Sequence, residues 1–114
     1  MELLIYVMNK TEKLDQLLHV FSENNLTGAT IINSTGMMHK LYDDDVDSYK
    51  FLSLRNFFDP ERKESKTIMM VVSEEQVELV TEIIEGVVGD LNQCDNGIVF
   101  TVPVNFSKGL NKWK

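Results

Sequence analysis

The chain has 114 residues, 43% of them hydrophobic and 25% charged, which is typical of one soluble globular domain. Its net charge of −7 argues against a nucleic-acid-binding protein, because phosphate contacts need clustered lysine and arginine. No apolar run reaches the ~18 residues that a membrane-spanning helix needs, which argues against a transmembrane protein.

Two further features favour a cytoplasmic location. The N-terminal stretch MELLIYVMNK carries an acid where a signal peptide would carry bases, and it has no cleavage site of small residues. The single cysteine, Cys94, cannot form an internal disulfide, as is usual for proteins of reducing compartments.

The first half of the chain predicts a strand, a helix and a second strand. ELLIYVM at 2–8 is a continuous apolar run of strand length. Asn9 and Glu12 have the spacing of a capping box, and apolar residues then recur at helical spacing as far as the ENN at 23–25. TGATIIN at 27–33 is the second predicted strand, which ends at Thr35-Gly36.

The second half repeats this plan after an insert at 39–65. KTIMMVV at 66–72 predicts a third strand. Ser73 and Gln76 form a capping box for a helix that Gly89 would end. GIVFTVPV at 97–104 is the last strand, where Pro103 indicates a strand end or edge, and a tail at 105–114 follows.

Two β-α-β units in residues 1–114 predict a single α+β domain of the ferredoxin-like type, with two helices on one face of a four-stranded antiparallel sheet. A sheet covered on one face should alternate apolar and polar residues, whereas LLIYVM, IMMVV and IVFTVPV are apolar at both parities. Because two helices cannot cover both faces, we expect an oligomer that packs sheet against sheet.

Three blocks of the sequence resemble the PII nitrogen-regulatory signalling proteins. KLDQLLHVFSENNLTGATIINSTG at 13–36 resembles their first helix and second strand. VVSEEQVELVTEIIE at 71–85 resembles their third strand and second helix, and NGIVFTVPV at 96–104 resembles their last strand. The insert at 39–65 stands where PII proteins carry their long T-loop.

The resemblance implies a homotrimer whose sheets pack around a central axis. It also implies clefts between subunits that bind adenine nucleotides or related small molecules, and a T-loop that engages partner proteins according to ligand state. By position, Gly36 matches the first glycine of the T-loop base, and Gly97 matches the last glycine of the nucleotide-contacting loop.

The predicted ligand site is an intersubunit cleft. One border is the T-loop base, formed by Gly36, Met37, Met38 and His39, and the other is the loop before the last strand, formed by Asn96 and Gly97. Lys66 and Lys108 are expected to be the main sources of positive charge. An acidic protein must concentrate its bases to hold an anion, and these lysines flank the strand ends. A monophosphate, a cyclic nucleotide or a smaller anion is expected rather than a full triphosphate, and no cofactor is assigned.

Within the insert, Phe51, Leu54 and Phe58 recur at helical spacing and predict a short helix within 48–58. These three residues either pack on their own trimer or form a partner-binding surface, and the sequence leaves both interpretations open. The expected partner is a protein target such as a transporter or an enzyme.

Enzymatic activity is not expected, because the sequence shows no Ser-His-Asp set, paired carboxylate site or phosphate-binding glycine loop. YDDDVD at 42–47 lacks the calcium-loop pattern, so no metal site is predicted. Two alternatives stay open: a CutA-like trimer concerned with metal tolerance, and a small dimeric ferredoxin-like enzyme.

Overall fold

The fold is known from a computed structural model, and the structure describes residues 1–44 and 64–110. Four strands form one antiparallel sheet: β1 (Glu2–Met8), β2 (Thr30–Ser34), β3 (Ser65–Val72) and β4 (Ile98–Pro103). Their order is β2-β3-β1-β4, so that β2 and β4 are the two edge strands. The expected α+β architecture with a four-stranded antiparallel sheet is therefore confirmed, and it is compatible with a ferredoxin-like fold.

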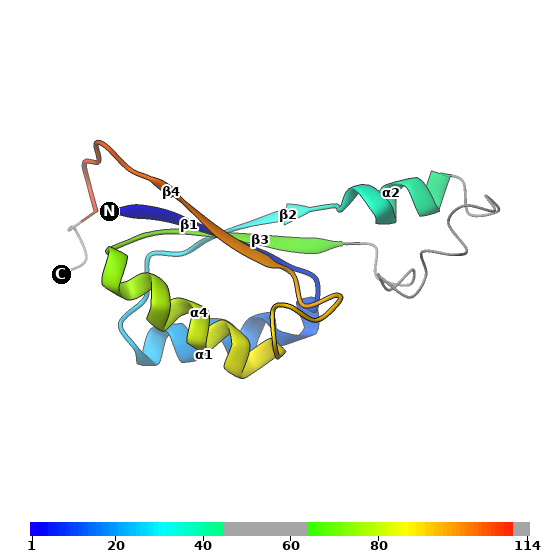
Figure 1. The fold of residues 1–114 in the computed structure, drawn as a ribbon, viewed down its shortest axis with the longest axis horizontal. Coiled ribbons are helices and arrows are strands. Elements are labelled where there is room, and N and C mark those ends of the chain that lie inside the picture. The colour runs from blue at the N-terminus through cyan, green and yellow to red at the C-terminus, as the bar shows by residue number, and fades with distance from the viewer. Residues whose placement is uncertain (45–63, 111–114) are drawn as a thin grey trace.

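Two helices cover one face of the sheet. A short 3₁₀ turn, η1 (Thr11–Lys13), leads into α1 (Leu14–Glu23), and α4 (Glu74–Val88) joins β3 to β4. Figure 1 shows α1 and α4 side by side beneath the strands, as right-handed crossovers require. A further helix, α2 (Met37–Asp44), continues from β2 away from the sheet. No helix in the described part of the chain is long and apolar enough to span a bilayer.

The core lies between the sheet and these two helices. Every second residue of β1 and β3 points into it, and the helices supply the facing apolar side chains. Its fully buried members with the largest volumes are Tyr6, Phe21, Leu4, Met8, Leu17, Ile68, Ile84 and Val80. Side chains of this kind supply most of the free energy of folding, about 1.5–3 kcal/mol for each large apolar side chain removed from water.

The other face of the sheet, which we call the open face, is also apolar. The register places Val7 opposite Ile98 and Ile5 opposite Phe100, so these side chains alternate with those that enter the core. Ile98 and Phe100 on β4 are 58% and 44% exposed, and Ile32 on β2 is 45% exposed. The prediction of strands that are apolar at both parities therefore corresponds to a real apolar surface on the side away from the helices.

The capping signals of the second half are confirmed. Ser73 Oγ accepts a hydrogen bond from the Gln76 N–H at 3.3 Å, and Gln76 Oε1 accepts one from the Ser73 N–H at 2.9 Å. Gly89 ends α4 with φ +102°, and its N–H donates to Glu85 O. Local side-chain chemistry therefore fixes both ends of this helix.

The capping box expected at Asn9 and Glu12 is wrong. The Asn9 carbonyl accepts a hydrogen bond from the Thr11 N–H, and the chain then forms η1 without any side-chain cap. The α-helix begins only at Leu14, again without a side-chain cap. Because the 3₁₀ turn comes first, the N-cap position of α1 is Lys13 and not Asn9.

Candidate ligand site

The buried polar side chains of the described residues lie at one end of the sheet. At this end, which we call the loop end, β1 and β2 finish while β3 and β4 begin. His39, Ser65 and Asn96 are 8%, 2% and 5% exposed, and they are the buried polar residues of the described part of the chain. All three lie at the loop end, because each is within a few residues of a strand terminus there.

The residues that were predicted to form a T-loop base, Gly36 to His39, lie where β2 passes into α2. The Lys40 N–H donates to Gly36 O at 3.0 Å, which closes the first turn of α2. Met37 is 75% exposed, Met38 is half-buried, and His39 is buried beside Gly36. A Cβ placed on Gly36 would lie 3.3 Å from His39 Nδ1. The helix itself was missed by sequence reasoning, since glycine before Met37 gives no side-chain capping signal.

A hydroxyl cluster joins β2 to β3 at the loop end. Ser34 Oγ lies 2.7 Å from Ser65 Oγ and 2.8 Å from Thr67 Oγ1. The register pairs Ser34 with Ser65, and Thr67 follows two residues later, so the three hydroxyls share the open face. These hydrogen bonds satisfy the buried Ser65 hydroxyl. Sequence reasoning missed this cluster, because strand pairing brings together residues that are far apart in the chain.

The loop before β4 is tied to the core through Tyr6 and Asn96. The Tyr6 hydroxyl donates to Asn96 O at 2.7 Å, and burial raises the pKa of this phenol well above its ordinary value. Asn96 Nδ2 donates to Asp90 O at 2.6 Å and so closes the loop on itself. The role of Tyr6 was also missed. Its signal is the lone hydroxyl in an apolar strand, since a buried hydroxyl needs a partner.

The backbone conformation and the close neighbours at position 97 require a glycine. Its φ is +93°, and an added Cβ would lie 2.1 Å from Val7 O and 2.8 Å from Tyr6 Cε1. No side chain fits in that space without moving β1 or β4. Asn96 and Gly97 therefore have structural roles that need no ligand.

The two lysines of the predicted site, Lys66 and Lys108, lie at opposite ends of the sheet. Lys66 at the loop end donates through Nζ to Asn33 Oδ1, and Lys10 donates through Nζ to Val88 O at 3.4 Å. Lys108 lies beyond the far end of β4, exposed to solvent. A six-residue strand spans about 20 Å, so within one chain Lys108 is remote from Gly97. Sequence reasoning did not single out Lys10, the base that precedes η1.

The two borders of the predicted cleft also lie apart within one chain. Gly36 follows β2 and Gly97 precedes β4, and these are opposite edges of the sheet. Three strand spacings separate the edges, which is about 14 Å. Within a single chain, both borders of the predicted cleft therefore lie at the loop end of the sheet but on its opposite edges. The predicted partner-binding residues Phe51, Leu54 and Phe58, and the helix predicted within 48–58, lie outside the described residues.

Within residues 1–44 and 64–110, no group of three or more His, Cys, Asp and Glu side chains is placed to hold a metal ion. A comparison of the sequence with protein families found no matching family, and a comparison with curated proteins found no matching relative.

Proposed function

We propose that the chain is a PII-like regulatory protein with a ferredoxin-like fold, which acts as a cytoplasmic homotrimer. It senses a small anionic ligand, with adenine nucleotides as the leading candidates, in clefts between subunits. It signals through residues 39–65 to a protein target such as a transporter or an enzyme. The observation that carries this proposal is the apolar open face of the sheet, together with a predicted site whose two borders lie on opposite edges of one chain.

The open face supports assembly because it exposes large apolar side chains in one layer. Ile98, Phe100 and Val102 are 58%, 44% and 41% exposed along β4, and β1 adds half-buried leucine, isoleucine and valine beside them. Contiguous apolar surface of this kind marks protein interfaces. Packing one such sheet on another would bury it, at a gain of about 25 cal/mol for each Å² of apolar area removed from water.

Assembly would also complete the ligand site. Packing of sheets brings the β2 edge of one subunit toward the β4 edge of its neighbour, so that Gly36–His39 of one chain and Asn96–Gly97 of another can border one cleft. Lys66 supplies positive charge at the loop end, and the tail of a neighbouring subunit can supply Lys108. Concentrated bases are needed here because the chain carries a net charge of −7.

The assembly is tested with a charge placed in the open face. Wild type is expected to have three times the 13.1 kDa mass of one chain by light scattering, whereas Phe100→Glu is expected to be a monomer. A buried, unpaired carboxylate costs several kcal/mol, which is enough to dissociate the interface. Phe106→Glu is the matched control, because Phe106 is 82% exposed but lies in the tail beyond β4. A wild type that stays monomeric or dimeric at micromolar concentration contradicts the proposal.

The ligand is tested by calorimetric titration with AMP, ADP, ATP and cyclic AMP. Phe100→Glu is expected to lose binding together with assembly, since the cleft needs two chains. Lys108→Ala is expected to keep the trimer but bind roughly ten- to a hundredfold more weakly, because a charge-assisted contact contributes about 1.5–3 kcal/mol. A trimer that binds none of these nucleotides would separate the two halves of the proposal: the assembly would stand and the nucleotide assignment would fail.

A further inference from the structure

The far end of the sheet has an unpaired strand edge. β2 pairs with β3 only from Ser65 to Met69, while β3 continues to Val72. Within the described residues, no strand lies beside Met70–Val72 on that side. Alternate residues of a strand direct their N–H and C=O groups toward such an edge. An unpaired edge of this kind is a template for strand addition by another chain, and natural proteins usually cover it.

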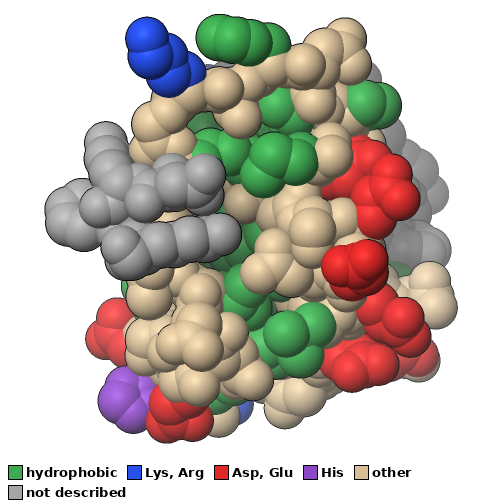
Figure 2. All heavy atoms as spheres, turned by 90° about the vertical axis from the view of Figure 1, so that its left-hand side faces the viewer, with side chains coloured by type: hydrophobic (Ala, Val, Ile, Leu, Met, Phe, Trp, Pro, Cys, Tyr) green, Lys and Arg blue, Asp and Glu red, His purple; other side chains and the backbone are tan. Residues whose placement is uncertain are grey.

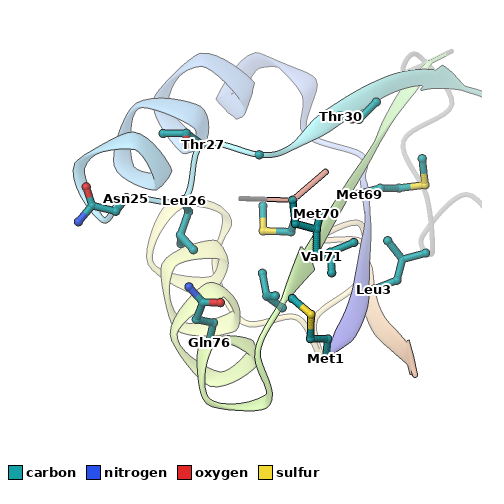
Figure 3. Close-up of a pocket in the computed structure, with 13 residues that line it drawn as sticks. Met1, Leu3, Asn25, Leu26, Thr27, Thr30, Met69, Met70, Val71 and Gln76 are labelled. Atoms are coloured by element: carbon teal, nitrogen blue, oxygen red, sulfur yellow. The ribbon is translucent and has the colours of Figure 1, made fainter. Parts of the chain in front are cut away.

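A groove runs along this edge. It has a volume of about 860 Å³ and is bounded by the end of β3, the segment 25–28 before β2, and the N-terminal turn of α4. Figure 3 shows Leu26 and Gln76 facing Met70 across the groove, with Met1 and Leu3 on the sheet side. Most of its lining residues are apolar, and no acidic or basic side chain of the described residues contributes to it. Such a groove suits an extended apolar segment better than an ion.

The C-terminal segment of the chain reaches this groove. The Val104 N–H donates to Met1 O at 3.0 Å, which fixes the start of the segment beside β1. Leu110 is one of the residues that line the groove, and it is 38% exposed. Phe106 in the same segment is 82% exposed and is not part of the lining. Figure 2 views this end of the molecule and shows hydrophobic side chains gathered over it.

We propose that residues 105–110 form a strap that closes the edge groove of their own chain, with Leu110 as the anchoring side chain. The strap covers the free edge of β3 and so prevents strand addition by a second copy at Met70–Val72. Two features support this assignment. Leu110, which is 38% exposed, lines the groove together with apolar residues at the end of β3, and the hydrogen bond from Val104 to Met1 O holds the start of the strap at the same end of the sheet. This proposal does not depend on the ligand or on the trimer.

The test measures hydrogen exchange in the full chain for Leu110→Asp and Phe106→Asp. Both variants place a carboxylate in the strap, but only the first removes the anchor from the groove. In Leu110→Asp, amides in peptides covering 25–30 and 69–72 are expected to exchange roughly tenfold faster, since losing the partial burial of one leucine corresponds to about 1.4 kcal/mol. Phe106→Asp is expected to leave exchange at wild-type rates. Far-UV circular dichroism confirms that both variants fold.

Two further readouts decide the role of the strap. Leu110→Asp is expected to form larger species by sedimentation velocity as concentration rises, through the uncovered edge, while Phe106→Asp does not. Wild-type protection of 69–72 is expected to be independent of protein concentration, because the strap belongs to the same chain. Equal exchange in the two variants overturns the proposal. Protection that rises with protein concentration also overturns it, since the occupant would then come from a second copy.

Discussion

Replacing Gly97 with alanine tests how tightly β4 is held against β1. The glycine combines φ of +93° with a backbone carbonyl that would lie 2.1 Å from the new Cβ. An alanine in left-handed backbone costs about 1–2 kcal/mol even where there is space for it. At Gly97 there is no such space, because Val7 O belongs to the adjacent strand β1 and cannot move without disturbing the hydrogen bonds between β1 and β4.

The contact adds a second cost. To clear the Cβ, the chain must separate β1 from β4 near the Val7–Ile98 pair or displace the Tyr6 ring, whose Cε1 would be 2.8 Å away. Either change loses one or two hydrogen bonds, including that from Tyr6 to Asn96, at about 1 kcal/mol each. Together with the backbone strain, Gly97→Ala is expected to lower the free energy of unfolding by roughly 3–4 kcal/mol.

Gly109→Ala is the matched control, because Gly109 has φ +98° but nothing lies within 4 Å of its added Cβ. It is expected to cost no more than about 1–2 kcal/mol, which is the backbone strain alone. The assay is urea unfolding followed by far-UV circular dichroism at one fixed protein concentration, since self-association shifts apparent stability. If Gly97→Ala loses no more stability than Gly109→Ala, the close approach of β1 and β4 does not hold as described.

Three other predictions concern the core and its buried phenol. Tyr6→Phe is expected to lower the free energy of unfolding by about 1–2 kcal/mol in urea titrations, because the buried Asn96 carbonyl loses its donor. The folded-state pKa of Tyr6 is raised above its ordinary 10.0, so the wild type keeps the stability from this burial below pH 10 and loses it as the pH rises further, by up to about 1.4 kcal/mol per pH unit. The stability of Tyr6→Phe is expected to lack this alkaline slope. Parallel plots of stability against pH for the two proteins would contradict the assignment. Ile84→Ala, at a fully buried site of α4, is expected to cost about 2–5 kcal/mol by thermal melting. Leu79→Ala on the same helix, where the side chain is 37% exposed, is expected to cost much less, and equal losses would place the core elsewhere.

The sequence alone determined the elements whose signals are local. The apolar run at 2–8 is β1 residue for residue, and the run predicted at 66–72 is β3 with one residue added at its start. The Ser73–Gln76 capping box and Gly89 set both ends of α4, because each acts through hydrogen bonds to nearby backbone. The apolar residues at both parities of the strands also predicted a second apolar face, since successive side chains on a strand point to opposite sides.

The tertiary structure decided whatever depends on residues that are distant in the chain. Tyr6 and Asn96 are 90 positions apart, and Ser34 and Ser65 are 31 apart, so no local pattern could pair them. The strand order placed the predicted cleft borders on opposite edges, and it moved Lys108 to the end away from Gly97. The edge groove likewise arises because β2 is shorter than β3, a difference that only the pairing register reveals. Local sequence encodes where strands and helices form, whereas pairing and packing between distant segments decide which side chains meet.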